Sequence, residues 1–141
     1  MASETQPTVQ DVIAVAEFRS ALRHFLRRSE KIARHSGLTP QRYTLLMMIK
    51  GAPDGSEQST VTELAERLQL AQSTITELVR RAESAGLIDR EQSQRDARVA
   101  HLRLTPDGDR RLMLAFTELE TERMQLRDAF SHLDGGLTGS G

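Results

Sequence analysis

The chain has 141 residues, of which 38% are hydrophobic and 28% charged, with 20 acidic against 19 basic side chains and no cysteine. This length fits one domain, and the missing cysteines exclude disulfides, thiolate metal ligands and a cysteine nucleophile. The longest apolar runs, such as Leu45 to Ile49, have five residues, far fewer than the roughly 20 of a membrane span. Residues 1–11 lack the pattern of a secretory signal, so we expect a cytoplasmic protein.

Residues 9–35 predict one long amphipathic helix. Its apolar residues recur at three- and four-residue steps, with a serine at position 29, which is the spacing of one helical face: Val15, Phe18, Leu22, Phe25 and Ile32. A row of arginines, Arg19, Arg23 and Arg27, runs beside this face at four-residue steps. Such a row is usually a solvated surface. Gly37 is a suitable residue to end the helix.

Three shorter helices are predicted next. Thr39 is a suitable N-cap and Pro40 a suitable first residue for a helix that ends at Gly51. Residues 60–68 and 73–85 then each place apolar side chains on one helical face. Because only four residues separate these two segments, the helices must meet at a sharp angle. This short separation is typical of a helix-turn-helix.

A β-hairpin and a long last helix are predicted after Gly86. Residues 87–91 lead out, and residues 98–104 return with alternating apolar and polar side chains, which is typical of a half-buried strand. Thr105-Pro106 repeats the signal of an N-cap followed by proline and begins one helix that continues to residue 133. The glycine-rich residues 134–141 are expected to form a flexible tail.

This order of elements predicts a mainly α fold with a small β-hairpin wing, a winged helix-turn-helix. The second helix of such a motif lies in the DNA major groove, and the wing reaches the minor groove. The polar residues that this helix would offer to DNA are Gln72, Ser73, Thr74, Thr76, Arg80 and Arg81. Purely structural roles stay open for three of them, because Ser73 also suits an N-cap and the two arginines also suit a solvated surface.

Positive charge is concentrated around the same motif. Of the 19 basic residues, 17 are arginine, whose planar fork suits phosphate and guanine better than a lysine does, although genome composition also raises arginine content. Residues 80–103 hold six arginines against four acidic residues, whereas residues 105–141 have a net charge of −3. A nearly neutral chain can therefore present a local basic surface.

The predicted tip of the hairpin has the sequence Gln94-Arg95-Asp96-Ala97-Arg98. An arginine at such a tip suits a narrow minor groove, whose negative potential attracts the guanidinium group. Asp96 would hold the Arg98 side chain in position before binding. The pair equally fits a surface ion pair of about 0 to 1 kcal/mol without a function, and the tip alone does not decide between the two interpretations.

Several segments together resemble the MarR family of dimeric winged-helix transcription regulators, and the resemblance covers residues 10–133. Four of them are Leu38-Thr39-Pro40-Gln41-Arg42-Tyr43, Val61-Thr62-Glu63-Leu64-Ala65-Glu66-Arg67-Leu68, Ser73-Thr74-Ile75-Thr76-Glu77-Leu78-Val79 and Ala85-Gly86-Leu87-Ile88. The most specific part is Arg95-Asp96-Ala97-Arg98 followed by Leu102-Arg103-Leu104-Thr105-Pro106-Asp107-Gly108. A helix-turn-helix alone would not be specific to the family.

The resemblance implies a homodimer that binds a pseudo-palindromic operator in double-stranded DNA. The whole chain, residues 1–141, would be a single domain in which residues 39–105 form the winged core and residues 9–36 and 107–133 form dimerisation helices. Arg98 would enter the minor groove with Asp96 as its support. Ser73, Thr74 and Thr76 would meet the DNA from the recognition helix.

The chain departs from the family pattern in two places. Many members carry a basic residue where this chain has Glu77. Because an acid facing phosphate would be repelled, Glu77 either accepts from a cytosine amino group or faces elsewhere. The further C-terminal helix that members commonly add to the dimer interface is also missing from the sequence pattern, so the dimer would depend on the first and last helices alone.

The resemblance further implies release from DNA by small aromatic anions, bound between the dimerisation helices and the winged core. Candidate residues of such an effector pocket are Arg19, Arg23, His24 and Tyr43. An arginine could pair with a carboxylate and the tyrosine could stack on a ring. Solvated arginines and a packed tyrosine are the alternative, and an aromatic content of 4% gives a pocket little to stack with.

No metal, cofactor or catalytic site is expected. The histidines His24, His35, His101 and His132 show no three- or four-residue pairing, and the chain lacks a phosphate loop and a nucleophile elbow. We therefore expect a DNA-binding transcription regulator, a repressor tuned by a small ligand, rather than an enzyme. Two other functions stay open: a winged helix that binds a protein partner, and a ligand sensor that does not bind DNA.

Overall fold

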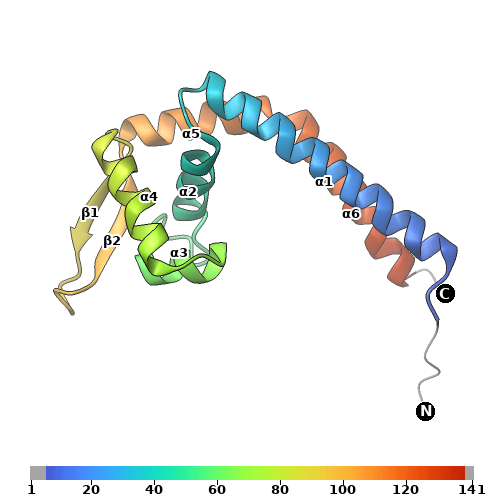
Figure 1. Ribbon diagram of the computed structural model, residues 1–141, viewed down its shortest axis with the longest axis horizontal. Helices are drawn as coiled ribbons and strands as arrows, with labels where there is room; N and C mark the ends of the chain where they lie inside the picture. The colour runs from blue at the N-terminus through green and yellow to red at the C-terminus, as the bar shows by residue number, and fades with distance from the viewer. Residues whose placement is uncertain (1–5, 139–141) are drawn as a thin grey trace, which may run out of the picture.

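Helices dominate the computed structural model, which describes residues 6–138 (Figure 1). In chain order the elements are α1 (Val9–His35), α2 (Pro40–Lys50), α3 (Val61–Leu68), α4 (Gln72–Ser84), β1 (Ile88–Gln92), β2 (Ala100–Leu104), α5 (Pro106–Glu118) and α6 (Glu120–Thr138). The predicted fold class is confirmed, because α3, α4 and the β1–β2 hairpin form a winged helix-turn-helix with further helices on both sides in the sequence.

Threonine side chains begin four of the helices. Each accepts a hydrogen bond from the backbone N–H three residues on, which satisfies a donor that has no partner inside the helix. The four N-caps are Thr8, Thr39, Thr60 and Thr105. Pro40 and Pro106 follow two of these caps at positions where the missing N–H is not needed. The two helix starts predicted from a threonine followed by a proline are therefore confirmed.

One hydrophobic core joins the C-terminal end of α1 to the winged helix-turn-helix and α5. The bulky aliphatic residues at its centre are almost fully buried: Ile32, Leu45, Leu46, Ile49, Leu64, Ile75, Val79, Leu102 and Leu119. Burying a side chain of this size stabilises a fold by roughly 1.5 to 3 kcal/mol. The exposed residues of α4 and of the wing are thus attached to a well-packed support.

The base of the wing is fixed on two sides. Ser59 forms an isolated bridge to β2, where its backbone N–H donates to the Leu102 carbonyl at 3.1 Å and its carbonyl accepts from the Leu102 N–H at 2.8 Å. On the other side Gly108 lies so close to Leu87 that a Cβ would come within 2.2 Å of the Leu87 carbonyl oxygen. The hairpin therefore has a defined position relative to α3 and α5.

Helices α1 and α6 pack along one another and extend away from the winged core (Figure 1). The rings of Phe18 and Phe130 meet edge to face with their centroids 6.0 Å apart, and Arg28 forms an ion pair with Glu122 at 3.3 Å. We call this pair of helices the arm. Several of its large apolar side chains stay exposed, among them Val12 at 62% and Met124 at 60%.

The single last helix predicted from the sequence is wrong, because residues 106–138 form two helices. Helix α5 ends at Glu118, and Leu119 leaves the helical geometry with φ −93° and ψ 9° before α6 begins. The Leu119 side chain is fully buried, and Arg123 of α6 donates to the Phe116 carbonyl near the end of α5. Core packing and this hydrogen bond together stabilise the bend.

The expectations for the C-terminal region are corrected as well. The further helix that the sequence pattern lacked is α6, which packs on α1. It continues to Thr138, so residues 134–138 are helical where the composition predicted a flexible tail. Each glycine costs a helix roughly 0.5 to 1 kcal/mol relative to alanine, but extending an existing helix is much easier than nucleating one. Residues 139–141 lie outside the described part of the chain.

Candidate nucleic-acid interface

The turn between α3 and α4 sets the direction of the candidate recognition helix. Gln69 ends α3 in the left-handed region with φ 55°, and the Leu70 N–H donates to the Ala65 carbonyl at 3.1 Å. Helix α4 then begins with Ala71 as its N-cap, without a side-chain capping bond. The interpretation of Ser73 as the N-cap is therefore wrong, and the first N–H groups of α4 receive no side-chain cap.

The six polar residues predicted on this helix share one exposed surface, because Ile75, Val79 and Ala82 turn the opposite side into the core. All six side chains are exposed: Gln72, Ser73, Thr74, Thr76, Arg80 and Arg81. Hydroxyl and amide groups at the N-terminal turn, together with the N–H groups there, form a surface that can donate to phosphate and base edges.

The structure shows where the side chain of Glu77 points, the acidic residue at which this chain differs from the family pattern. Its carboxylate accepts from Arg80 at 2.6 and 3.1 Å and from Arg81 Nε at 3.1 Å. The Arg80 hydrogen bond lowers the pKa of the Glu77 carboxyl, with a smaller contribution from Arg81. Arg80 and Arg81 are thus exposed but not free, since both are paired within their own helix.

The wing tip is held by short-range hydrogen bonds. The Asp96 carboxylate accepts from the backbone N–H of Arg98 at 3.0 Å and from its Nε at 3.3 Å, while 92% of the Arg98 side chain stays exposed. The Ser93 hydroxyl accepts from the backbone N–H of Arg95 at 3.2 Å. The tip therefore presents a guanidinium group to solvent on an ordered turn. Sequence reasoning missed Ser93, whose position at the start of the turn was the available signal.

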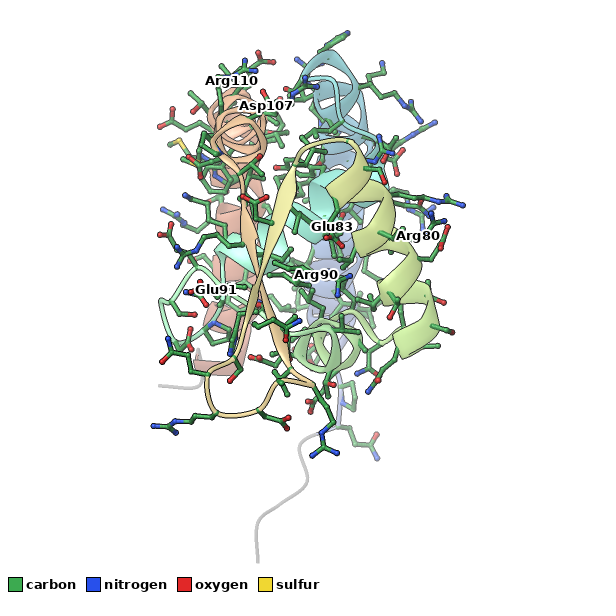
Figure 2. The ribbon with its side chains drawn as sticks, turned by 90° about the vertical axis from the view of Figure 1, so that its left-hand side faces the viewer. Arg80, Glu83, Arg90, Glu91, Asp107 and Arg110 are labelled. Carbon is green, nitrogen blue, oxygen red and sulfur yellow. The ribbon has the colours of Figure 1, made fainter. Side chains whose placement is uncertain are left out.

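An ion pair between α4 and the wing was also missed. Arg90 of β1 donates to both carboxylate oxygens of Glu83 in α4, with Nε–O distances of 2.9 and 3.0 Å and an Nη2–O distance of 2.8 Å. Figure 2 shows the two side chains pointing toward one another between the helix and the hairpin. The pair links the C-terminal end of α4 to the wing.

The candidate effector residues differ in exposure. Arg19, Arg23 and His24 are exposed on α1, whereas Tyr43 of α2 is buried, and burial raises its pKa. Tyr43 lines a hollow of about 80 Å³ between the two helices. His24 instead borders a separate surface hollow that consists only of α1 side chains. In this chain by itself the hollow at Tyr43 is smaller than the roughly 300 Å³ of common ligand pockets.

Two further properties concern the described residues only. Across residues 6–138 no group of three or more histidine, aspartate and glutamate side chains is placed to hold a metal ion. Over the same stretch, none of the helices combines the length and the apolar composition that crossing a membrane requires.

A helix pair joined by a tight turn, with a hairpin beside its second helix, defines a winged helix-turn-helix protein. The sequence profile of the MarR family matches residues 36–99, from the C-cap of α1 to the residue before β2. The resemblance inferred from the sequence is thereby confirmed, because the matched residues fold as the winged helix-turn-helix.

Solved structures of that family share the fold. A mutant of MarR from E. coli complexed with operator DNA is 17% identical, with 95% of this chain and 98% of that chain covered and a TM-score of 0.68. A mutant of MepR from S. aureus bound to an oligodeoxyribonucleotide is 18% identical, with coverages of 86% and 91% and a TM-score of 0.64. AbsC, a MarR family transcriptional regulator from Streptomyces coelicolor, is 21% identical, with coverages of 92% and 84% and a TM-score of 0.64. No curated protein matches the chain in sequence.

Proposed function

We propose that this chain is a transcriptional repressor that binds a pseudo-palindromic operator in double-stranded DNA as a homodimer. Helix α4 of each copy enters the major groove, and the wing enters the adjacent minor groove. The observation that carries the proposal is Arg98, 92% exposed and held by Asp96 at the end of a hairpin that flanks the exposed polar surface of α4. The narrow minor groove attracts such an arginine. The two similar structures with DNA bound add support.

The two parts of the interface have different roles in this proposal. The N-terminal turn of α4 contributes Gln72, Ser73, Thr74 and Thr76, whose side chains suit base edges as well as phosphate. Arg95 and Arg98 of the wing contribute charge, which positions the protein on the backbone and in the groove. The α4 residues therefore determine most of the sequence preference, while the wing determines most of the affinity.

The exposed apolar side chains of the arm and of α5 support the homodimer in this proposal. Large apolar side chains that are exposed together on a few elements are typical of an interaction surface: Val9, Val12, Ile13, Val15, Leu26, Met113, Leu114, Phe116, Met124 and Phe130. A second copy would bury them in a self-complementary contact with two-fold symmetry. Such a dimer presents two recognition helices, which matches an operator with two related half-sites.

A small anionic ligand, in this proposal, releases the repressor in the cytoplasm. Arg19, Arg23 and His24 would bind its negative group, and Tyr43 would contact its ring once the hollow between α1 and α2 opens. The ligand must bind the DNA-incompetent dimer more tightly than the competent one, because equal affinity would shift nothing.

Selection of binding sites from a random pool of duplex DNA, followed by gel shifts with the wild type and with Arg98→Ala, tests the proposal. We expect Arg98→Ala to bind the selected duplex at least about tenfold more weakly, a loss of roughly 1.4 kcal/mol. Arg34→Ala is the matched control, since it removes an exposed arginine from the end of α1 and should bind like the wild type.

Three results would contradict the proposal. Unchanged affinity of Arg98→Ala would remove the minor-groove assignment. A binding constant that hardly changes with salt would favour a protein partner, because phosphate contacts make DNA binding steeply salt-dependent. Ligand-dependent melting of a chain that selects no DNA would identify a sensor without DNA binding.

A further inference from the structure

The candidate DNA-binding surface has acidic residues as built-in partners for its arginines. Glu77 pairs with Arg80 and Arg81 inside α4, and Asp96 pairs with Arg98 in the wing. The two sites differ in how much the acid occupies the guanidinium. Arg98 keeps 92% of its side chain exposed and uses only Nε, whereas Arg80 gives Nε and Nη2 to both oxygens of one carboxylate.

Glu77 also lies in the middle of the exposed surface of α4. Ser73, Glu77 and Arg81 follow one another at four-residue steps, so their side chains line one side of the helix. The opposite side, with Ile75 and Val79, is fully buried. Glu77 therefore lies between the hydroxyl group of Ser73 and the two arginines, Arg80 and Arg81, of the same helix.

A carboxylate and a DNA phosphate compete for the same guanidinium groups. Both are anions with oxygen pairs that match the fork of arginine. A phosphate that approaches α4 meets two arginines whose charge is partly cancelled, and it is repelled by Glu77 unless it displaces that carboxylate. Contacts to phosphate supply essentially all of non-specific DNA binding, so this arrangement weakens non-specific binding more than contacts to base edges.

We propose that Glu77 is a specificity-determining residue, an internal counter-ion that keeps Arg80 and Arg81 from non-specific phosphate contacts. It thereby raises the ratio of specific to non-specific affinity. This inference rests on the proposed function, because it concerns the same DNA-binding surface.

The test uses Glu77→Gln, which keeps the size of the side chain and removes its charge. Binding to a mixed-sequence duplex of about 30 base pairs is followed by fluorescence anisotropy over a series of NaCl concentrations. We expect non-specific binding about tenfold tighter at moderate salt, and a slope of log affinity against log salt that is steeper by about one to two per protomer, since each new phosphate contact adds about 0.9. The affinity for the selected duplex should rise less, so that the specificity ratio falls.

Glu91→Gln is the matched control. Glu91 is an exposed acid of β1 in the wing, it is labelled in Figure 2, and it forms no ion pair with any residue that the structure describes. The same change of charge at Glu91 should have a clearly smaller effect on the slope. Adding Arg80→Ala and Arg81→Ala to Glu77→Gln should abolish the gain, because the released arginines are then absent.

The possible outcomes separate this inference from the proposed function. If the wild type binds neither duplex at low salt, the proposed function fails. If the wild type binds DNA and Glu77→Gln behaves like Glu91→Gln, the inference is overturned while the function stands. Glu77→Ala, which places a strong helix former at the same position, must reproduce the result of Glu77→Gln and guards against a folding defect in one variant.

Discussion

A single carboxylate oxygen of Asp96 accepts hydrogen bonds from both the backbone N–H and the side-chain Nε of Arg98. We expect Asp96→Ala to lose the turn at the wing tip and to bind DNA about three- to tenfold more weakly, because Arg98 must then be ordered during binding, at a cost of roughly 1 kcal/mol. Gel shifts on the selected duplex measure this loss.

Asp96→Asn is the informative control for that change. An asparagine keeps an oxygen that accepts from the Arg98 backbone N–H, so the turn is retained, while the negative charge is removed. We expect affinity equal to or above that of the wild type. A loss as large as that of Asp96→Ala would mean that the charge, rather than the ordered turn, is what matters at this position.

How far single residues of the interface could be predicted depends on whether their partners are close in sequence. The Asp96–Arg98 pair spans two residues, so its motif was visible, and the exposed surface of α4 followed from the helical period. The role of Glu77 could only be left open, because its carboxylate can accept either from a cytosine amino group or from neighbouring arginines such as Arg80 and Arg81. Glu83 could not be predicted at all, since its partner lies beyond a turn and no helical spacing relates the two.

The ion pair between Glu83 and Arg90 is the contact to test between elements. The two side chains are 29% and 42% exposed, so solvent weakens the pair despite its two-pronged geometry. A double-mutant cycle with Glu83→Gln and Arg90→Gln, measured by urea unfolding, should give a coupling free energy of about 0.5 to 1 kcal/mol.

The comparison for this cycle is Arg80 with Glu77, a pair within one helix. We expect the two pairs to couple with similar strength in unfolding, because both are exposed. Only loss of the Glu83–Arg90 pair should weaken DNA binding through the angle between α4 and the wing. Equal DNA affinity of the wild type and Arg90→Gln would mean that the buried contacts alone fix that angle.

Helix starts and the hairpin could be predicted because caps, prolines and a change of period are local signals. The bend at Leu119 could not be predicted, since no proline or glycine marks it and a buried leucine is equally common inside a helix. It exists because Leu119 packs into the core while α6 turns to follow α1. The helical residues 134–138 were missed for a related reason, because composition says nothing about a helix that is already formed upstream.

In the proposed dimer, the arm determines the oligomeric state of the molecule. Val12 is 62% exposed on α1, and an aspartate there would place a charge in the proposed contact between two copies. We expect Val12→Asp to weaken the dimer at least about tenfold, which light scattering over a range of concentrations measures. Operator affinity should fall with it, since one copy reads only one half-site.

Leu70→Asp is the control for a new charge at an exposed leucine, because Leu70 is 44% exposed at the turn between α3 and α4, away from the arm. It should stay dimeric. A wild type that remains a monomer at micromolar concentration would contradict the dimer itself, and with it the two-fold match to an operator.

Because α1 is long, a small change of angle at the junction between the arm and the winged core produces a large displacement at the far end of the helix. With 27 residues, α1 is about 40 Å long at a rise of 1.5 Å per residue. A tilt of about 5° at the junction moves the far end of such a rod by about 3.5 Å, close to the spacing of successive base pairs. In the proposed dimer, a small molecule that separated α1 from α2 by a fraction of its own width would therefore shift the two recognition helices relative to the turns of the DNA, without changing the shape of either helix.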